Sequence, residues 1–336
     1  MGLFTWAGKI VAAILVERIL KRLIVAILGL MLVIAVVITG TSPVQAATGT
    51  GGVTPIPVAW ADLKQYSFSK VSAGTLIYNA PNGSVVGGFP EGFSFVPLVK
   101  KENGFGQMMD GRWVELSSLT GESASQFAGW SIPGALPAQL GWMLLYTKPS
   151  PTPGAPSNRA LTSYHRYQQV TIMATQHAGQ WDWYEVAPGQ WVEQRRIARI
   201  IPASRPGGAT NKWVSVNIYE QVLTAYEGNN MVFATMVATG LSPAWSTHIG
   251  TFNVWHRQTS TKMYGDMGGP DFYNLPYVPY VMFFDKNISL HGTYWHDGFG
   301  YEHSHGCVNM SITDAKWIYN WSSDTPNMTV DVIAGP

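Results

Sequence analysis

The sequence contains a single cysteine, Cys307, among its 336 residues. One cysteine excludes an intramolecular disulfide and a structural zinc site built from several thiolates. Charged residues are also scarce, at 12% of the chain with a formal net charge of +1, so nothing supports a nucleic-acid-binding protein that works through bulk positive charge. Hydrophobic residues make up 46%, which excludes a coiled coil and a highly charged disordered protein. The length allows two or three domains of roughly 100–200 residues each.

The N-terminal segment, residues 1–46, carries four basic residues against one acidic residue, which leaves a net charge of −2 for the remainder. An uncharged apolar run over 23–39 follows Arg18, Lys21 and Arg22, and small residues precede Ala46. This pattern predicts a secretory signal cleaved after Ala46 or an uncleaved signal-anchor helix. Either interpretation predicts an extracytoplasmic protein, secreted or anchored in the membrane.

A Gly-, Thr- and Pro-rich linker over 47–57 precedes a region with a weak internal repeat. The hexapeptide at 111–116, Gly-Arg-Trp-Val-Glu-Leu, returns 78 residues later at 189–194 as Gly-Gln-Trp-Val-Glu-Gln. Short β-rich runs separated by Gly and Pro surround both copies, which predicts two small β-modules, over 58–125 and 126–204. The layout resembles tandem bacterial SH3-like barrels, which often accompany cell-wall enzymes.

Aromatic residues in the second module have two interpretations. Trp181, Trp183 and Tyr184 could stack on a glycan or a peptide, or they could pack in the core of the module.

The C-terminal third has the alternating apolar and polar pattern of half-buried strands. A turn at 227–230 is rich in residues that tolerate positive φ. Near the end of the chain, a hydroxyl residue followed three positions later by a carboxylate favours a helix start. We therefore expect a mainly β domain, with strands over 214–219, 222–226 and 231–239, and one short helix over Thr313–Trp321.

Potential catalytic residues concentrate between Ser289 and Asn309, where four of the eight histidines lie beside the only cysteine. A thiolate is the nucleophilic form of cysteine, and a nearby imidazole can take the thiol proton and return it to a leaving amine. Gly306 next to Cys307 allows backbone N–H groups to point at a developing oxyanion. The segment therefore predicts a Cys–His acyl-transfer site.

Two other interpretations of the same segment remain open. His303, His305 and Cys307 alternate, so on a strand they would share one face and could bind a metal with His291 as a fourth ligand. Cys307 could also be a buried structural residue.

The motif Ser304-His305-Gly306-Cys307-Val308-Asn309, with His291 sixteen residues before Cys307, resembles the signature of the L,D-transpeptidases, the YkuD-type catalytic domain. The resemblance extends over 212–334 and includes the segments 249–252 and 279–284. It implies a β-sandwich with Cys307 as nucleophile and His291 as the group that takes its proton. It places the oxyanion and substrate pocket at Ser304, His305, Gly306, Asn309, Gly292 and Thr293, with no cofactor and no metal.

The resemblance also implies a substrate class. A peptidoglycan tetrapeptide stem would acylate Cys307 with loss of D-alanine, and the side-chain amine of a second stem would complete a 3→3 crosslink. Water as acceptor would give an L,D-carboxypeptidase instead, and a non-catalytic wall-binding protein is a third alternative. The expected partners are stem peptides, glycan through the middle modules, and the membrane if residues 1–46 are uncleaved, without nucleic acid.

The resemblance assigns no role to two further features. His296 and His303 are expected to be packed or solvated. Tyr264 and Tyr273 could belong to a lid, because Gly265, Gly268 and Gly269 could serve as hinges, or to an ordinary surface loop.

Overall fold

The computed structural model describes residues 52–66, 68–265 and 271–335. The expected signal or anchor segment, residues 1–46, lies outside this range. Within the described residues, no helix is both long enough and apolar enough to cross a membrane. All of them belong to one compact unit, Gly49–Pro336.

The first of two large sheets contains the three strands predicted from the C-terminal pattern, which are confirmed. It is antiparallel except where the C-terminal strand β25 pairs in parallel with β17. Two very short strands from the N-terminal half, β1 and β10, extend one edge. The order across the sheet is β1 (Thr54–Pro55), β10 (Trp130–Ser131), β19 (Asn230–Met236), β18 (Val222–Glu227), β17 (Lys212–Asn217), β25 (Thr329–Ile333) and β20 (Gly250–Asn253).

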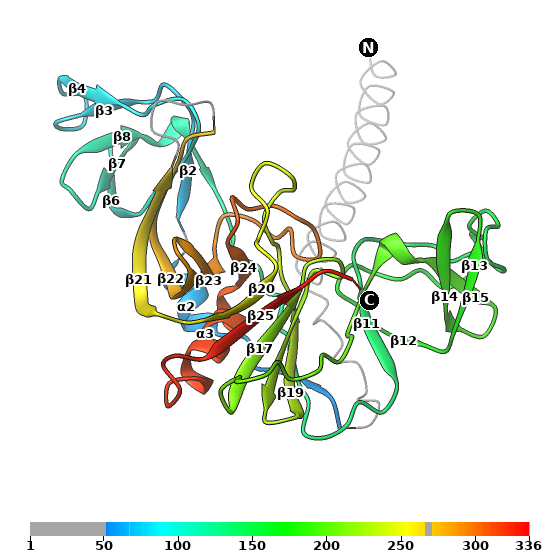
Figure 1. Cartoon of the computed structure of the whole chain (residues 1–336). Coiled ribbons are helices and arrows are strands. Elements are labelled where there is room, and N and C mark those ends of the chain that lie inside the picture. Colours follow the sequence, from blue (N-terminus) through cyan, green and yellow to red (C-terminus); the bar gives the residue numbers. More distant parts are fainter. Residues whose placement is uncertain (1–51, 67, 266–270, 336) are drawn as a thin grey trace, which may run out of the picture. The chain divides into compact units, whose positions relative to one another are not determined.

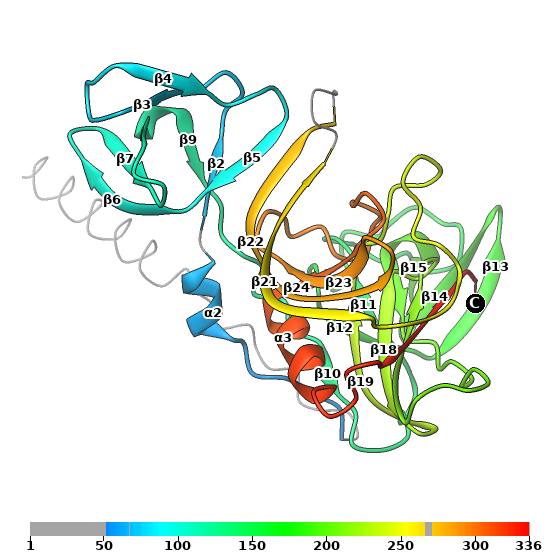
Figure 2. The same ribbon diagram turned by 60° about the vertical axis from the view of Figure 1, so that its left-hand side comes forward.

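The second large sheet also joins distant parts of the chain. Its order is β24 (Val308–Ser311), β23 (Ile288–Thr293), β22 (Tyr273–Asp285), β5 (Phe93–Val96), β2 (Ser69–Val71) and β9 (Leu119–Gly121), and β21 (His256–Gly265) also pairs with β22. Strand β5 pairs in parallel with β22, with Phe93 opposite Tyr273. The β21–β22 hairpin is therefore continuous with strands from the N-terminal half of the chain (Figure 2).

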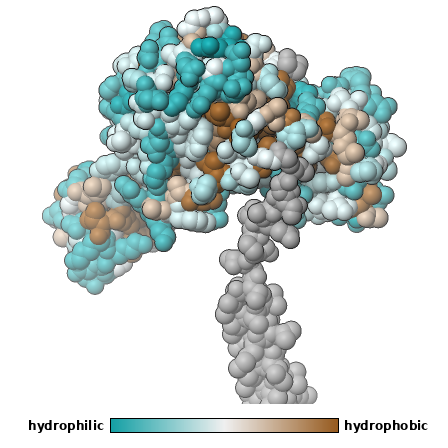
Figure 3. Space-filling model, turned by 90° about the horizontal axis from the view of Figure 1, so that it is seen from below, coloured by the Kyte–Doolittle hydropathy of each residue, from teal (hydrophilic) through white to brown (hydrophobic). Residues whose placement is uncertain are grey.

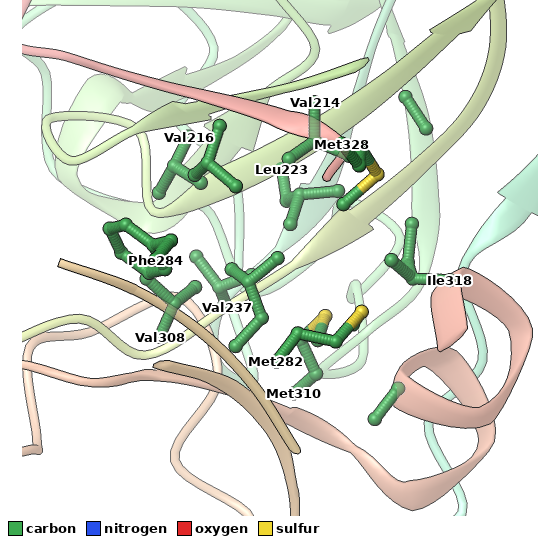
Figure 4. Packing of buried hydrophobic residues seen from close by; sticks show 14 of the residues in the cluster. Val214, Val216, Leu223, Val237, Met282, Phe284, Val308, Met310, Ile318 and Met328 are labelled. Atoms are coloured by element: carbon green, nitrogen blue, oxygen red, sulfur yellow. The ribbon is translucent and has the colours of Figure 1, made fainter. Parts of the chain in front are cut away.

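The main core lies between these two sheets and the helix α3 (Ile312–Trp321), as Figure 4 shows. Val214 and Leu223 of the first sheet belong to the same buried cluster as Met282 and Val308 of the second sheet and Ile318 of α3. The mainly β prediction is thus confirmed, and the expected C-terminal helix is found. A second helix, α2 (Trp60–Gln65), was not predicted from the sequence.

The two copies of the hexapeptide adopt the same local structure. The first forms β8 (Trp113–Glu115) and enters a 3₁₀ turn over Leu116–Ser118, and the second forms β15 (Gln190–Glu193) and enters a 3₁₀ turn over Gln194–Arg196. The first residue of each hexapeptide is a glycine with positive φ, +87° at Gly111 and +66° at Gly189. The repeat is therefore structural as well as sequential.

Strand pairing repeats as well. In the first module β2 pairs with β5 and β9, and in the second β11 (Gln139–Met143) pairs with β12 (Gln169–Ile172) and β16 (Ile197–Arg199). The antiparallel run β6 (Leu98–Glu102), β7 (Phe105–Met108) and β8 corresponds to β13 (Ala174–Ala178), β14 (Trp181–Ala187) and β15 (Figure 1). The first module also contains β3 (Leu76–Tyr78) and β4 (Val85–Gly88). This shared topology supports a duplication, and the SH3-like assignment stays a prediction.

The structure decides between the two interpretations of the second-module aromatics only for Tyr184, because Trp181 and Trp183 are half-buried. Tyr184 is buried in the core of the second module, so for this residue the core-packing alternative holds. Trp181 is half-buried beneath the guanidinium of Arg195, 4.1 Å from its ring centroid. Figure 3 shows hydrophobic patches on one face of the molecule. The exposed large hydrophobic residues include Trp255, which stacks on His256.

The short helix α2, over Trp60–Gln65, docks on α3 (Figure 2). The backbone N–H of Ala59 donates to Thr313 Oγ1 at 3.1 Å, and Lys316 Nζ lies 2.6 Å from Asp62 Oδ2. Tyr280 also donates a hydrogen bond to Asp62. Burial alone would raise the pKa of Asp62, but the hydrogen bonds from Lys316 and Tyr280 hold it below its ordinary value.

The second module is tied to the first large sheet by a buried ion pair. The backbone N–H and the guanidinium of Arg199 both donate to the carboxylate of Glu220, at 2.8 and 2.9 Å. Both side chains are largely removed from water, so loss of either partner would leave a buried charge uncompensated.

A fully buried carboxylate, Asp314, joins α3 to the first large sheet. Its two oxygens accept hydrogen bonds from the backbone N–H of Gly129, at 2.8 Å, and from the hydroxyl of Thr235, at 2.6 Å. Burial raises the pKa of Asp314 to about 6, and these hydrogen bonds offset only part of that rise. The unfolded carboxyl titrates near 3.9, so the native state loses stability as the pH rises from about 4 to about 6.

Asp314→Asn is expected to reduce this pH dependence. An asparagine oxygen can still accept from Gly129, and its NH₂ can donate to Thr235 Oγ1. The hydroxyl proton of Thr235 can then turn to the carbonyl oxygen of Met236, which lies 3.2 Å from Oγ1. The difference in unfolding free energy between pH 4 and pH 7 should change by about 1–3 kcal/mol relative to the native protein. Urea unfolding at both pH values measures it, and parallel curves for the two proteins would contradict the assignment.

Candidate active site

The register of two parallel strands places Cys307 relative to His291. Leu290 lies opposite Val308 and His291 opposite Asn309, and Cys307 directly precedes β24. Because side chains alternate along a strand, Ser289 and His291 share one face of β23, and Cys307 continues the same face of β24. The sheet therefore carries the thiol and the imidazole on the same face of neighbouring strands.

The thiol of Cys307 is half-buried and is the only cysteine side chain in the sequence. Its Sγ lies 3.7 Å from Ser289 Oγ and 3.8 Å from the carbonyl oxygen of Asn287. Burial raises the pKa of the Cys307 thiol, and hydrogen bonds from the backbone and side chain of Ser289 lower it in part. The resting form at neutral pH is therefore the thiol.

The imidazole of His291 is buried at 2% exposure. Its Nδ1 lies 3.1 Å from the carbonyl oxygen of Gly292. In the neutral ring Nδ1–H donates to that carbonyl, which leaves the lone pair on Nε2 to accept a proton. Burial lowers the pKa of His291 to about 4, so the ring is neutral at pH 7. The pair rests as thiol and neutral imidazole, and the thiol must lose its proton during attack.

Ser304 shapes the loop that presents Cys307. Its hydroxyl donates to the carbonyl of Cys307 at 2.5 Å and accepts from the N–H of Gly306 at 3.2 Å. Gly306 has φ +111°, a conformation that L side chains rarely adopt. A Cβ at this position would also lie 3.2 Å from Ile288 Cδ1. The loop therefore depends on Ser304 and Gly306 for its shape.

A second segment supports this loop from behind. The hydroxyl of Thr247 donates to the carbonyl of Gly306 at 2.7 Å and accepts from the N–H of Gly240 at 2.9 Å. A Cβ on Gly240 would approach the carbonyl oxygen of Trp245 to 1.9 Å and Gly306 Cα to 2.8 Å. Gly240 is thus required where the two backbones meet.

Other residues predicted for the pocket lie deeper or further out. Thr293 is fully buried, and a Cβ on Gly292 would lie 2.9 Å from Pro279 Cγ and 3.3 Å from the backbone of α3. Both residues therefore pack in the interior. His305 is exposed, with its ring 4.5 Å from that of Trp245.

Asn309 connects the two large sheets and holds His296. Its backbone exchanges hydrogen bonds with Ala238 at 2.9 and 3.0 Å. Its side-chain amide lies 2.9 Å from His296 Nε2, and the N–H of Gly298 donates to His296 Nδ1 at 2.9 Å. Burial lowers the pKa of His296 well below its ordinary value. His296 is therefore a packed neutral histidine, as expected.

The alternating-ligand interpretation for a metal is wrong in its geometry. Residues 303–307 form a loop and not a strand, so His303, His305 and Cys307 do not share a strand face. The ring of His303 instead lies against that of His296, with ring centroids 4.0 Å apart and the rings tilted by 49°. Across the described ranges, no group of three or more His, Cys, Asp or Glu side chains is placed to hold a metal ion.

One of the two expected lid tyrosines reaches the site. Tyr273, at the start of β22, has its ring 5.1 Å from that of His305. Burial raises the pKa of Tyr273, and the negative charge of a Cys307 thiolate adds to the rise. Tyr264 lies on β21 and is exposed. Gly268 and Gly269 lie outside the described residues, so the hinge prediction stays a prediction.

Two contact residues near Cys307 were missed from the sequence. Ser289 carried no spacing signal of its own, although it lies two positions before His291 on the same strand. Thr247 lies 60 positions before Cys307 in a segment without a recognisable motif. Its role depends on a contact between loops that no local pattern encodes.

Alkylation of Cys307 offers a direct test of its resting state. We expect reaction with iodoacetamide to be slow at pH 7 and to reach half its maximum above the ordinary thiol value of about 8.5. Intact-mass measurement across pH 6–11 follows this residue, the only cysteine in the sequence, once the slower alkylation of lysine amines has been subtracted with Cys307→Ala as the blank. A midpoint below 7 would indicate a preformed thiolate–imidazolium pair instead.

Comparison with known proteins locates the same region. Residues 211–332 match the family model for the L,D-transpeptidase catalytic domain, YkuD. The putative L,D-transpeptidase YciB of Bacillus subtilis (strain 168) is 28% identical over 125 residues, which cover 32% of this chain and 59% of that protein. The match therefore spans less than two thirds of the relative.

Solved structures with similarity to the chain include two L,D-transpeptidases. The enzyme from Stackebrandtia nassauensis is 26% identical, with a TM-score of 0.30 over 37% of this chain and 56% of that one. The enzyme from Mycobacterium smegmatis is 19% identical, with a TM-score of 0.34 over 51% and 72%. On the family match and the curated relative, residues 211–332 form an L,D-transpeptidase catalytic domain of the YkuD family.

Proposed function

We propose that the chain is a cysteine-dependent peptidoglycan L,D-transpeptidase that forms 3→3 crosslinks. The observation that carries the proposal is the placement of Cys307 and His291 on the same face of adjacent strands. The thiol and the neutral imidazole are the two groups that acyl transfer requires.

In the first half-reaction, His291 Nε2 takes the proton of the Cys307 thiol as the sulfur attacks a peptide carbonyl of a tetrapeptide stem. The bond that breaks joins the third residue, a diamino acid, to the terminal D-alanine. The backbone N–H groups of His305 and Cys307 would donate to the oxyanion, because the N–H of Gly306 already donates to Ser304 Oγ. His291 then gives its proton to the departing amine, and a thioester remains.

In the second half-reaction, the side-chain amine of another stem attacks the thioester. The C–N bond forms, the C–S bond breaks, and the Cys307 sulfur leaves. Water in place of the amine would release a tripeptide, which is the L,D-carboxypeptidase alternative. The same site serves both acceptors.

The remainder of the chain has a proposed role in placing this site at the bacterial cell wall. Residues 1–46 would act as signal peptide or anchor, so that the catalytic domain lies outside the cytoplasmic membrane. The two β-modules would contact the wall, and their duplicated topology supports a common origin.

Product analysis with a defined tetrapeptide donor and an amine acceptor tests the function. The full-length protein should form a Cys307 adduct lacking D-alanine, followed by a crosslinked dimer detected by mass spectrometry. Free tripeptide as the sole product would favour the carboxypeptidase. No adduct and no product would favour the non-catalytic wall-binding protein.

A further inference from the structure

An imidazole–carboxylate pair lies at the same end of the sheet as Cys307. His248 Nδ1 is 2.6 Å from Asp285 Oδ2, and the side chains are 61% and 13% exposed. The carboxylate is thus largely buried, while the imidazole faces solvent. Because Asp285 engages Nδ1, the ring is oriented with Nε2 free to accept a proton from a molecule in solution.

Asp285 is connected to the nucleophile through a short turn. It ends β22 and pairs with Ile288 at the start of β23. Between them, the carbonyl oxygen of Asn287 lies 3.8 Å from Cys307 Sγ. Ile288 Cδ1 lies 3.2 Å from the position of a Cβ on Gly306. The turn that carries Asp285 therefore contacts both the sulfur and the loop before it.

His248 is tied to the same loop from the other side. Its neighbour Thr247 donates to the carbonyl of Gly306 at 2.7 Å. The carbonyl of Ser246 also lies 3.7 Å from the Cβ position of Gly306. Two independent connections, through Thr247 and through Asp285, thus hold His248 beside the loop that presents Cys307.

We propose that His248, oriented by Asp285, is the base that removes the first proton from the acceptor amine. This inference rests on the proposed function and concerns only its second half-reaction. An alkylamine is protonated at neutral pH, since such groups titrate near 10, and an ammonium cannot attack a thioester. The nearby carboxylate of Asp285 also favours the approach of a cation.

The proton balance of the step requires two acceptors. His248 Nε2 takes one proton from the ammonium and later releases it to water. The neutral amine attacks, the C–N bond forms and the C–S bond breaks. The second amine proton passes to His291 and from there to the departing Cys307 sulfur, which restores the resting thiol and neutral imidazole. His291 is buried at 2% exposure and exchanges its proton with the Cys307 sulfur. His248 is exposed and is accessible to an incoming amine.

His248→Gln separates the two half-reactions. We expect the rate of acylation by the tetrapeptide, read as the Cys307 adduct, to stay within about twofold of the native rate. We expect the rate constant for attack of the amine acceptor on the preformed adduct to fall about 10²-fold, as for a removed acid–base group. Product would shift from crosslinked dimer toward free tripeptide.

The chain offers a control in the second module. His177 Nδ1 lies 3.0 Å from Asp182 Oδ1, and its imidazole is exposed like that of His248, although Asp182 is more exposed than Asp285. This pair is remote in sequence from the Cys307 loop. His177→Gln should leave both half-reactions unchanged. Imidazole added to His248→Ala should restore amine attack, because the ring site is open to solvent, and this rescue would not occur for a purely structural residue.

Equal rates of amine attack in His248→Gln and the native protein would overturn the proposal. It would also be overturned if His248→Gln lost acylation and amine attack to the same extent and imidazole did not rescue His248→Ala. Failure of the native protein to form any adduct is a different result, because it would overturn the proposed function itself.

Discussion

Cys307→Ala is expected to abolish acyl-enzyme formation with a tetrapeptide donor while the protein remains folded. The alanine removes the only thiol in the chain, and no second cysteine can replace it. The fold should survive because Sγ makes only long contacts, at 3.7 Å to Ser289 and 3.8 Å to Asn287. Intact-mass spectrometry after incubation with the donor measures the adduct, and a thermal unfolding curve measures the fold.

Cys307→Ser provides the control for this substitution. It preserves the size of the side chain and the contact with Ser289, but a hydroxyl is a far weaker nucleophile than a thiolate. Both variants should lack the adduct and unfold close to the native temperature. An adduct on Cys307→Ala with native kinetics would show that the acylated residue lies elsewhere.

His291→Gln is expected to slow acylation by about 10²- to 10⁴-fold. Glutamine can still contact the carbonyl of Gly292, but it cannot take the thiol proton. The pH profile of the native enzyme gives a second readout. Because burial lowers the pKa of His291 to about 4, its protonation should reduce acylation only as the pH falls toward 4, not near 6.5.

The control for this variant is His303→Gln, since His303 lies on the same loop as Cys307 but is exposed. It should retain acylation within a few fold of the native rate. Because His291 is buried, unfolding curves must show that the glutamine variant is folded at the assay temperature. A folded His291→Gln enzyme with native acylation would assign the proton acceptor to another group.

Local patterns in the sequence located the catalytic domain well. Alternation identified β17, β18 and β19, and a helix-capping signal identified α3, where Ser311 accepts from the N–H of Asp314 at 3.1 Å. The spacing between His291 and Cys307 identified the two residues that adjacent strands bring to one face. These features were accessible because each depends on residues close in sequence or on a specific motif.

The sequence does not predict which distant segments pair as neighbouring strands. Nothing in Phe93–Val96 indicates that it pairs with β22, and Thr54–Pro55 is too short to show a strand period. Thr247 and Asp285 contact the loop and the turn around Cys307 through tertiary packing. A small polar residue or a lone carboxylate has no spacing signal, so only the folded chain reveals such contacts.

The contact between α2 and α3 has a consequence for the order of folding during synthesis, because its two sides lie far apart in the sequence. Ala59 and Asp62 each find a partner 254 positions later, at Thr313 and Lys316. Translation proceeds from the N-terminus, so the buried carboxylate of Asp62 lacks its lysine partner until Lys316, 254 positions later, has been synthesised. Long-range closure of this kind is slow. A nascent chain that ends before Thr313 lacks most of α3, so this contact forms only after α3 has been synthesised.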